Sequence, residues 1–133
     1  MTHELIQRGA TNWNLGMLHA CAGGHPLLTQ EMIDHGANCL NWGLFVACQC
    51  GRLSVVHLLI DRGANDWNGG LCGACEGGQL ELAQKMIDLG ATDWNQGLYY
   101  ACRGHADVLI RTMIDQGATS CSYCQCPISS HTN

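Results

Sequence analysis

Residues 80–91 read Leu-Glu-Leu-Ala-Gln-Lys-Met-Ile-Asp-Leu-Gly-Ala, and this stretch indicates an amphipathic helix. Its apolar residues are spaced i, i+1, i+4 and i+5, which places them on one helix face, whereas a strand would alternate. These residues are Leu82, Ala83, Met86 and Ile87. Gly90 follows the last of the periodic residues, where the end of a helix favours a left-handed conformation. The stretch therefore predicts a helix that ends at a Gly-Ala pair.

The Gly-Ala pair recurs five times at a constant interval of 27 residues, with its glycines at Gly9, Gly36, Gly63, Gly90 and Gly117. A constant period is typical of a repeat array. Each unit is interpreted as a short helix, a Gly-rich turn and a longer helix, followed by a loop that carries Trp and Asn. One helix pair cannot bury its apolar face alone, so neighbouring pairs must stack. The sequence predicts an all-α fold, an α-solenoid of stacked helix-turn-helix repeats.

The period also sets the expected boundaries within a single repeat domain, 1–133. A partial N-terminal repeat covers 1–10, full repeats cover 11–37, 38–64, 65–91 and 92–118, and a C-terminal cap or tail covers 119–133. The short helices are expected at about 15–22, 42–49, 69–76 and 96–103. After Gly117 the pattern fails, and Pro127 disfavours a further helix.

The residues of the last full repeat resemble an ankyrin repeat. The run Gly97-Leu98-Tyr99-Tyr100-Ala101-Cys102-Arg103-Gly104-His105 matches the first helix, and Leu59-Ile60-Asp61-Arg62-Gly63-Ala64 matches the end of the second. The resemblance covers about residues 3–118, but the unit is shorter than the usual ankyrin length of about 33 residues. The Thr-Pro-Leu-His motif is absent, and the missing residues fall where ankyrin units carry a β-hairpin finger. The resemblance implies an ankyrin-like fold that binds a protein partner on a concave face lined by the short helices.

Composition limits the classes of partner. The chain has 133 residues, 47% of them hydrophobic and 13% charged, which excludes a disordered chain. A net charge of -5 gives no basic footprint, so no nucleic acid is expected as a partner. No apolar run approaches 18 residues and no leader is recognisable, so we expect no membrane association and an intracellular, cytoplasmic monomer. The pattern also resembles Trp-Asn/Gly-Leu/Ala-Cys arrays of large DNA viruses, and a viral source would imply the host cell cytoplasm.

Ten cysteines have several interpretations. Four share one repeat position, Cys21, Cys48, Cys75 and Cys102. Ankyrin units carry a small residue there, and free Cys packs as a small buried hydrophobe, so we predict a ladder of structural thiols. Cys72 and Cys75 form a C-x2-C pair, but no second pair completes a zinc site. No metal site is favoured; the alternative is a thiol- or zinc-binding module in the tail, with Cys121, Cys124, Cys126 and His131 as ligands.

Three further columns are assigned structural roles. The Asn column is interpreted either as helix caps or as a ladder between consecutive loops: Asn14, Asn41, Asn68 and Asn95. The Asp column lies where the helix dipole disfavours an anion: Asp34, Asp61, Asp88 and Asp115. We therefore hypothesise that each Asp accepts a bond from a loop amide or from an indole N–H. The Trp column is interpreted either as buried staples or as displayed anchors: Trp13, Trp67 and Trp94.

Positions that vary between repeats are the candidates for binding a partner. They lie on the short helices, beside the Ala-Cys pair: Leu18, His19, Phe45, Val46, Tyr99, Tyr100 and Arg103. Aromatic residues there would be typical interface anchors, although some of them could simply fill the core between repeats. No nucleophile, phosphate-loop, zincin or Rossmann motif is present, so neither an enzyme nor a cofactor is predicted.

Overall fold

The computed structural model describes residues 13–119, and all the regular structure in this range is helical. It contains eight described helices and no strand: α2 (Trp13–Gly23), α3 (Pro26–Asp34), α4 (Leu40–Cys50), α5 (Leu53–Asp61), α6 (Trp67–Gly77), α7 (Leu80–Leu89), α8 (Trp94–Arg103) and α9 (Asp107–Gln116). The prediction of an all-helical fold is confirmed. None of these helices has the length and apolar character that a membrane crossing requires.

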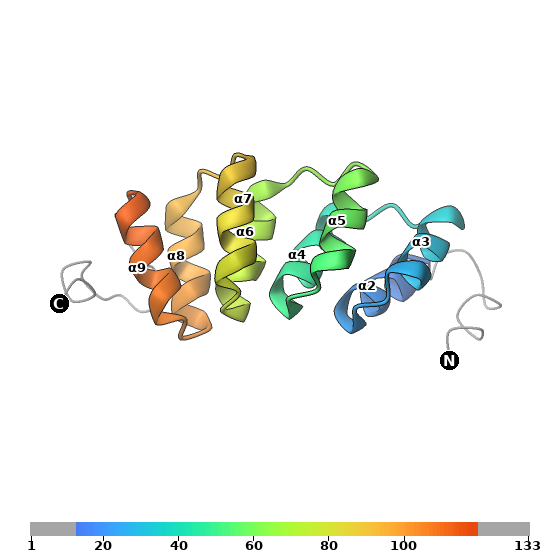
Figure 1. Ribbon diagram of the computed structural model, residues 1–133, viewed down its shortest axis with the longest axis horizontal. Helices are drawn as coiled ribbons and strands as arrows, with labels where there is room; N and C mark the ends of the chain where they lie inside the picture. Colours follow the sequence, from blue (N-terminus) through green and yellow to red (C-terminus); the bar gives the residue numbers. More distant parts are fainter. Residues whose placement is uncertain (1–12, 120–133) are drawn as a thin grey trace.

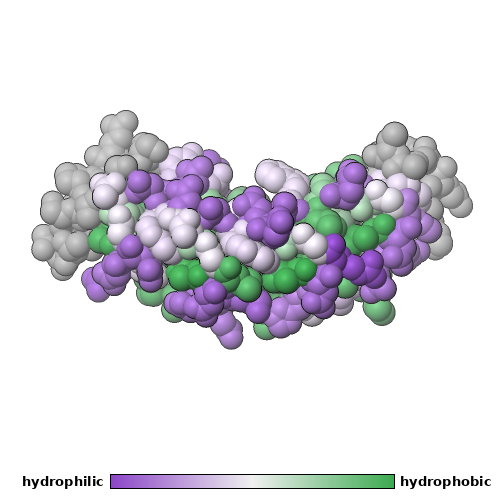
Figure 2. Space-filling model, turned by 90° about the horizontal axis from the view of Figure 1, so that it is seen from above, coloured by the Kyte–Doolittle hydropathy of each residue, from purple (hydrophilic) through white to green (hydrophobic). Residues whose placement is uncertain are grey.

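The helices lie in a row of four antiparallel pairs, with α2 and α3 at one end and α8 and α9 at the other (Figure 1). The first helices of the pairs, α2, α4, α6 and α8, pack extensively against one another. The second helices, α3, α5, α7 and α9, make far fewer contacts along the row. Close packing on one side and splaying on the other bend the row towards the first helices. Figure 2 shows this bend as a hollow along one long side of the molecule.

The first helices begin about two residues earlier than the sequence suggests. In α6 and α8 the N-cap residues are aspartates: Asp66 Oδ1 accepts the backbone N–H of Gly69 (2.9 Å), and Asp93 Oδ1 accepts that of Gln96 (3.2 Å). Trp and Asn follow the cap and lie inside the first helical turn, not in the preceding loop. The capping interpretation of the Asn column is therefore wrong, because in α4, α6 and α8 the cap position lies two residues before the Asn.

The helix ends follow the glycine pattern. Each second helix ends at or just before a Gly-Ala glycine with a positive φ, between 115° and 129°, at Gly36, Gly63, Gly90 and Gly117. The alanine after each of these glycines is buried, and it is 2–6% exposed. In the turns within the pairs, His105 takes the left-handed conformation (φ 55°) that glycines adopt in the other three. The glycine signals therefore placed the ends of the second helices correctly.

One continuous core runs along the row between the two layers of helices. Methionine and leucine side chains fill it, and the largest fully buried ones include Met17, Leu44, Leu71, Met86 and Leu98. Cys21, Cys48 and Cys75 are fully buried, and Cys102 is 6% exposed. Two of the thiols face a glycine of the next pair: a Cβ placed on Gly43 would lie 3.2 Å from Cys21 Sγ, and one on Gly70 would lie 3.5 Å from Cys48 Sγ. The ladder cysteines are therefore core side chains at closely packed helix contacts.

Candidate partner-binding surface

Four aromatic side chains gather on two of the first helices, α4 and α8. On α4, the rings of Trp42 and Phe45 are stacked with their centroids 5.5 Å apart. On α8, Tyr99 and Tyr100 meet edge to face at 5.1 Å. Phe45 and Tyr100 join the two groups, with centroids 5.8 Å apart and an interplanar angle of 72°. The cluster thus links α4 to α8 across α6, over two repeat periods of sequence.

The small residues of α6 make this long-range contact possible. At the repeat positions of Phe45 and Val46, α6 carries only Cys72 and Gly73. A Cβ on Gly73 would overlap the carbonyl oxygen of Phe45, so the two helix backbones are in direct contact there. No large side chain separates Phe45 from Tyr100. The glycine in α6 is therefore part of the reason that the cluster forms.

A hollow of about 380 Å³ opens beside the cluster at the N-terminal ends of α4, α6 and α8. Trp42, Phe45 and Tyr100 form its aromatic lining, and the cap residues Asp66 and Asp93 contribute carboxylates. The remaining lining residues are Asn41, Asn68, Gly69, Cys72 and Gln96. An aromatic wall beside two carboxylates gives this surface both apolar and acidic character.

The Cys72 thiol reports the electrostatics of the hollow. It is 5% exposed, and burial is the main reason that its pKa rises to about 12. The negative charges of Asp93, Asp66 and Glu76 raise this pKa further, because a second anion is unfavourable near them. The pKa of Tyr100 is also raised, first by burial and then by neighbouring groups that include Cys72 and Glu76. The carboxylates near the hollow therefore raise the pKa of both groups, whereas Arg103 lowers that of Tyr100.

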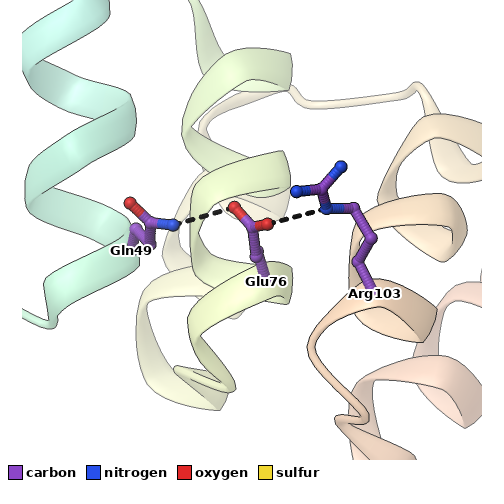
Figure 3. Close-up of polar contacts among 3 residues, drawn as sticks. All are labelled: Gln49, Glu76 and Arg103. Atoms are coloured by element: carbon purple, nitrogen blue, oxygen red, sulfur yellow. Dashed lines mark hydrogen bonds and ion pairs between the residues drawn. The ribbon is translucent and has the colours of Figure 1, made fainter.

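A polar chain crosses the first helices beside the cluster (Figure 3). Gln49 Nε2 donates to Glu76 Oε1 (2.8 Å), and Arg103 Nε donates to Glu76 Oε2 (3.0 Å). Hydrogen bonds to Tyr99 and to Glu76 raise the pKa of Arg103. The residues that follow Cys48, Cys75 and Cys102 thus join α4, α6 and α8, and Arg103 contributes to this link between helices.

Four of the seven predicted binding residues lie in or beside the aromatic cluster, and three do not. Phe45, Tyr99 and Tyr100 come together in the cluster, and Arg103 bonds to Tyr99 at its edge. Val46 is half-buried and packs against the core. Leu18 and His19 lie on α2, half-buried and exposed respectively, and neither residue lines the hollow.

The sequence reasoning missed three residues of this surface. Trp42 lies two residues after the Trp column position, which Leu40 occupies in its repeat, and its side chain is 58% exposed. Asp66 and Asp93 each lie three residues before the residue whose amide they cap. Aspartate is a preferred N-cap residue, and its place directly before Trp67 and Trp94 could have identified both aspartates.

The Asn column bridges successive loops. Asn41 Oδ1 accepts the backbone N–H groups of Asn65 (2.8 Å) and Asp66 (3.0 Å). Asn14 and Asn68 make the same pair of bonds one period earlier and one period later, and Asn95 accepts from the backbone of Thr119 (2.7 Å). These contacts correspond to the loop-ladder interpretation. They also hold the loops that carry the cap aspartates.

The hypothesis for the Asp column is wrong. Within the described residues, no loop amide or indole N–H donates to these four carboxylates, and all four side chains are exposed. Asp34 lies 3.5 Å from Arg62 Nη1 at the end of α5, and Asp88 accepts from Gln84 one turn earlier in α7 (3.1 Å). The physical reason is that the Asn side chains already bind the loop amides.

The Trp column is half-buried against the core. Trp13, Trp67 and Trp94 pack beside core residues, and Leu40 takes the same place in its repeat. In each case the side chain lies near the Gly-Ala glycine of its own repeat: a Cβ on Gly90 would lie 3.5 Å from Trp67 Cδ1. These side chains therefore cover helix ends and contribute to packing.

The remaining cysteine candidates divide by location. Burial is the leading cause that raises the pKa of Cys48 and Cys75 to about 12 and that of Cys21 to about 11. A thiol with so high a pKa is a poor nucleophile at neutral pH. No group of three or more metal-ligating side chains occurs within residues 13–119. The candidate zinc ligands Cys121, Cys124, Cys126 and His131 lie outside the described residues.

No protein-family model matches the sequence, and a search of curated proteins finds no significant match.

Proposed function

We propose that this chain is an ankyrin-like α-solenoid, built from the four 27-residue repeats, that acts without catalysis by binding a protein partner. The partner docks on the inner face formed by the first helices. The observation that carries this proposal is the aromatic cluster of Trp42, Phe45, Tyr99 and Tyr100, which gathers beside a hollow and joins α4 to α8 across α6. Repeat arrays use such extended faces for binding.

The physical chemistry of the cluster supports this role. Tryptophan and tyrosine are enriched among the residues that dominate binding energy at protein interfaces. Trp42 is 58% exposed and does not belong to the core, so its ring offers apolar area that a partner could bury. Phe45 stacks on the exposed Trp42 ring, and Tyr100 packs edge to face against Phe45, so the ring is partly held in place before binding, which lowers the entropic cost of binding.

The test is a quantitative pull-down that compares wild type with a Phe45→Ala/Tyr99→Ala/Tyr100→Ala variant. We expect proteins retained by wild type to be depleted about tenfold or more, because one aromatic anchor is worth about 2 kcal/mol or more. Trp42→Ala alone serves as a second variant, since its exposed side chain can be removed with little disturbance to packing.

A matched control removes apolar area from the opposite layer. Leu53 and Leu80 are 44% and 47% exposed beside a groove between α5 and α7, so Leu53→Ala/Leu80→Ala should retain the same proteins as wild type. Circular dichroism checks the helix content of each variant. Equal retention by wild type and by both cluster variants would contradict the proposal.

A further inference from the structure

The hollow beside the aromatic cluster has the chemistry of a site for an organic cation. We propose that it receives a lysine or arginine side chain from the partner protein. This inference rests on the proposed function, because it names the chemistry by which the inner face would recognise that partner. Two independent features of the hollow support it, its aromatic wall and its charge.

The aromatic wall suits a cation on an alkyl stem. The rings of Trp42, Phe45 and Tyr100 all border the hollow. A guanidinium or ammonium group is attracted to the face of such a ring, most strongly to tryptophan, and the alkyl stem packs against apolar surface. The volume of about 380 Å³ lies towards the low end of the range for ligand sites, roughly 300–1,000 Å³. One long side chain is therefore a suitable occupant.

The net charge of the hollow favours a positively charged occupant. The cap bonds engage Oδ1 of Asp66 and of Asp93, and within the described residues no donor binds the second oxygen of either carboxylate. Each helix N-terminus contributes roughly half a positive charge. Two full negative charges exceed the three half charges of α4, α6 and α8, so the net charge at the site is negative. Burial is the main cause of the raised pKa of the neighbouring Cys72 thiol, and Asp93 and Asp66 raise this pKa further, as a negative site would.

No basic side chain of the described part of the chain competes for the hollow. Its lining contains no Lys, Arg or His. Arg103, at the edge of the cluster, is held by Glu76 and Tyr99. The chain as a whole carries a net charge of -5, which would favour the approach of a basic segment. The site therefore has an unused negative charge directed at the same surface as the aromatic rings.

The decisive experiment selects binders from a random peptide display library with the full-length protein. We expect the enriched peptides to share a Lys or Arg at a fixed position. Replacing that residue with norleucine in synthetic copies should weaken binding at least tenfold. In the protein, Asp66→Asn/Asp93→Asn should weaken the same peptides at least tenfold, because Asn remains a good N-cap but removes both charges.

The matched control is Asp61→Asn/Asp115→Asn, which changes net charge equally through exposed residues at the ends of α5 and α9. This variant should bind the selected peptides as wild type does. Enriched peptides without a shared basic residue, or equal weakening by the two double variants, would overturn the cation site. Peptides without a shared basic residue could still lose binding to the Phe45→Ala/Tyr99→Ala/Tyr100→Ala variant. In that case the proposed function would stand and only the cation site would be rejected. No enrichment by wild type would count against both proposals.

Discussion

The contacts between the first helices differ along the row, although the helices share one repeat pattern. Between α4 and α6 the packing is the most extensive, and there α6 presents both Gly73 and Gly77 to backbone atoms of α4. A Cβ on Gly77 would overlap the carbonyl oxygen of Gln49. Between α2 and α4 the packing is less extensive, and α4 carries Val46 and Cys50 at the same two positions.

The α6–α8 contact is intermediate in composition. There a Cβ on Gly104 would overlap the carbonyl oxygen of Glu76, whereas α8 carries Tyr100 at the repeat position that Gly73 has in α6. At the α2–α4 contact, the carbonyl oxygen of Ala22 instead accepts a hydrogen bond from Arg52 Nε (3.0 Å). One or two glycines therefore set the local approach of the helices. This approach in turn decides where side chains from non-neighbouring helices, such as Phe45 and Tyr100, can meet.

The largest expected effect comes from closing the glycine contact. Gly77→Ala should lower the free energy of unfolding by about 1–3 kcal/mol, because its methyl group would push α6 away from the Gln49 backbone. The cost of this steric overlap must exceed the stabilisation of up to about 1 kcal/mol that Ala gives to a helix relative to Gly. Urea unfolding followed by circular dichroism measures the change.

The same substitution at the same repeat position of α2 is the control. A Cβ on Gly23 would meet only the ring of His25, an exposed side chain that can rotate away. Gly23→Ala should therefore be neutral or slightly stabilising. If Gly77→Ala and Gly23→Ala changed stability alike, backbone contact would not be what distinguishes the α4–α6 interface.

Substitution of the asparagines that bridge the loops should lower stability by a smaller amount. This loss should be equal at the α2–α4 and α4–α6 contacts. Asn14 Oδ1 accepts two backbone N–H groups beside the α2–α4 contact (2.8 and 3.1 Å), and Asn41 Oδ1 accepts two beside the α4–α6 contact (2.8 and 3.0 Å). Asn14→Ala and Asn41→Ala should each cost about 1–2 kcal/mol, since water can replace part of each bond. A much larger loss at Asn41, measured by the same urea titration, would mean that helix spacing controls these bonds too.

The sequence predicted the repeated features of the structure better than its unique ones. The 27-residue period, the apolar spacing of 80–91 and the Gly-Ala pairs together predicted the helices and the ends of the second helices, because those features depend on local geometry. The aromatic cluster could not be derived in this way. Phe45 and Tyr100 belong to repeats that are not neighbours, so their contact depends on the small residues of α6 and on the bend of the row.

The start of each first helix was also misplaced, for a local reason. Asn is a favourable cap, and its recurrence suggested that role, but Asp66 and Asp93 occupy the cap position two residues earlier. The Asp column failed for a related reason. A carboxylate at the end of a helix was expected to need a loop donor, whereas the Asn side chains already accept from the loop amides.

The smallest expected difference between the helix contacts is in the pH dependence of stability that their ladder thiols contribute. Burial raises the pKa of Cys75 from 9.0 to about 12 in the folded protein. The unfolded chain therefore loses this proton at a lower pH, and the stabilisation present below pH 9 is lost as the pH rises towards 12. Between pH 8 and 10 this one thiol should lower stability by roughly 1 kcal/mol, and Cys75→Ala should remove that share of the decrease.

The contribution of Cys21, at the α2–α4 contact, to the pH dependence of stability should differ from that of Cys75 only at the highest pH values. For Cys21, burial dominates but a hydrogen bond with Thr29 opposes it, so the pKa rises only to about 11. Its contribution should level off near pH 11, whereas that of Cys75 should continue to grow towards pH 12. Urea midpoints of wild type, Cys21→Ala and Cys75→Ala at a series of pH values measure both contributions. Parallel curves for all three proteins would show that neither thiol is buried as the structure places it.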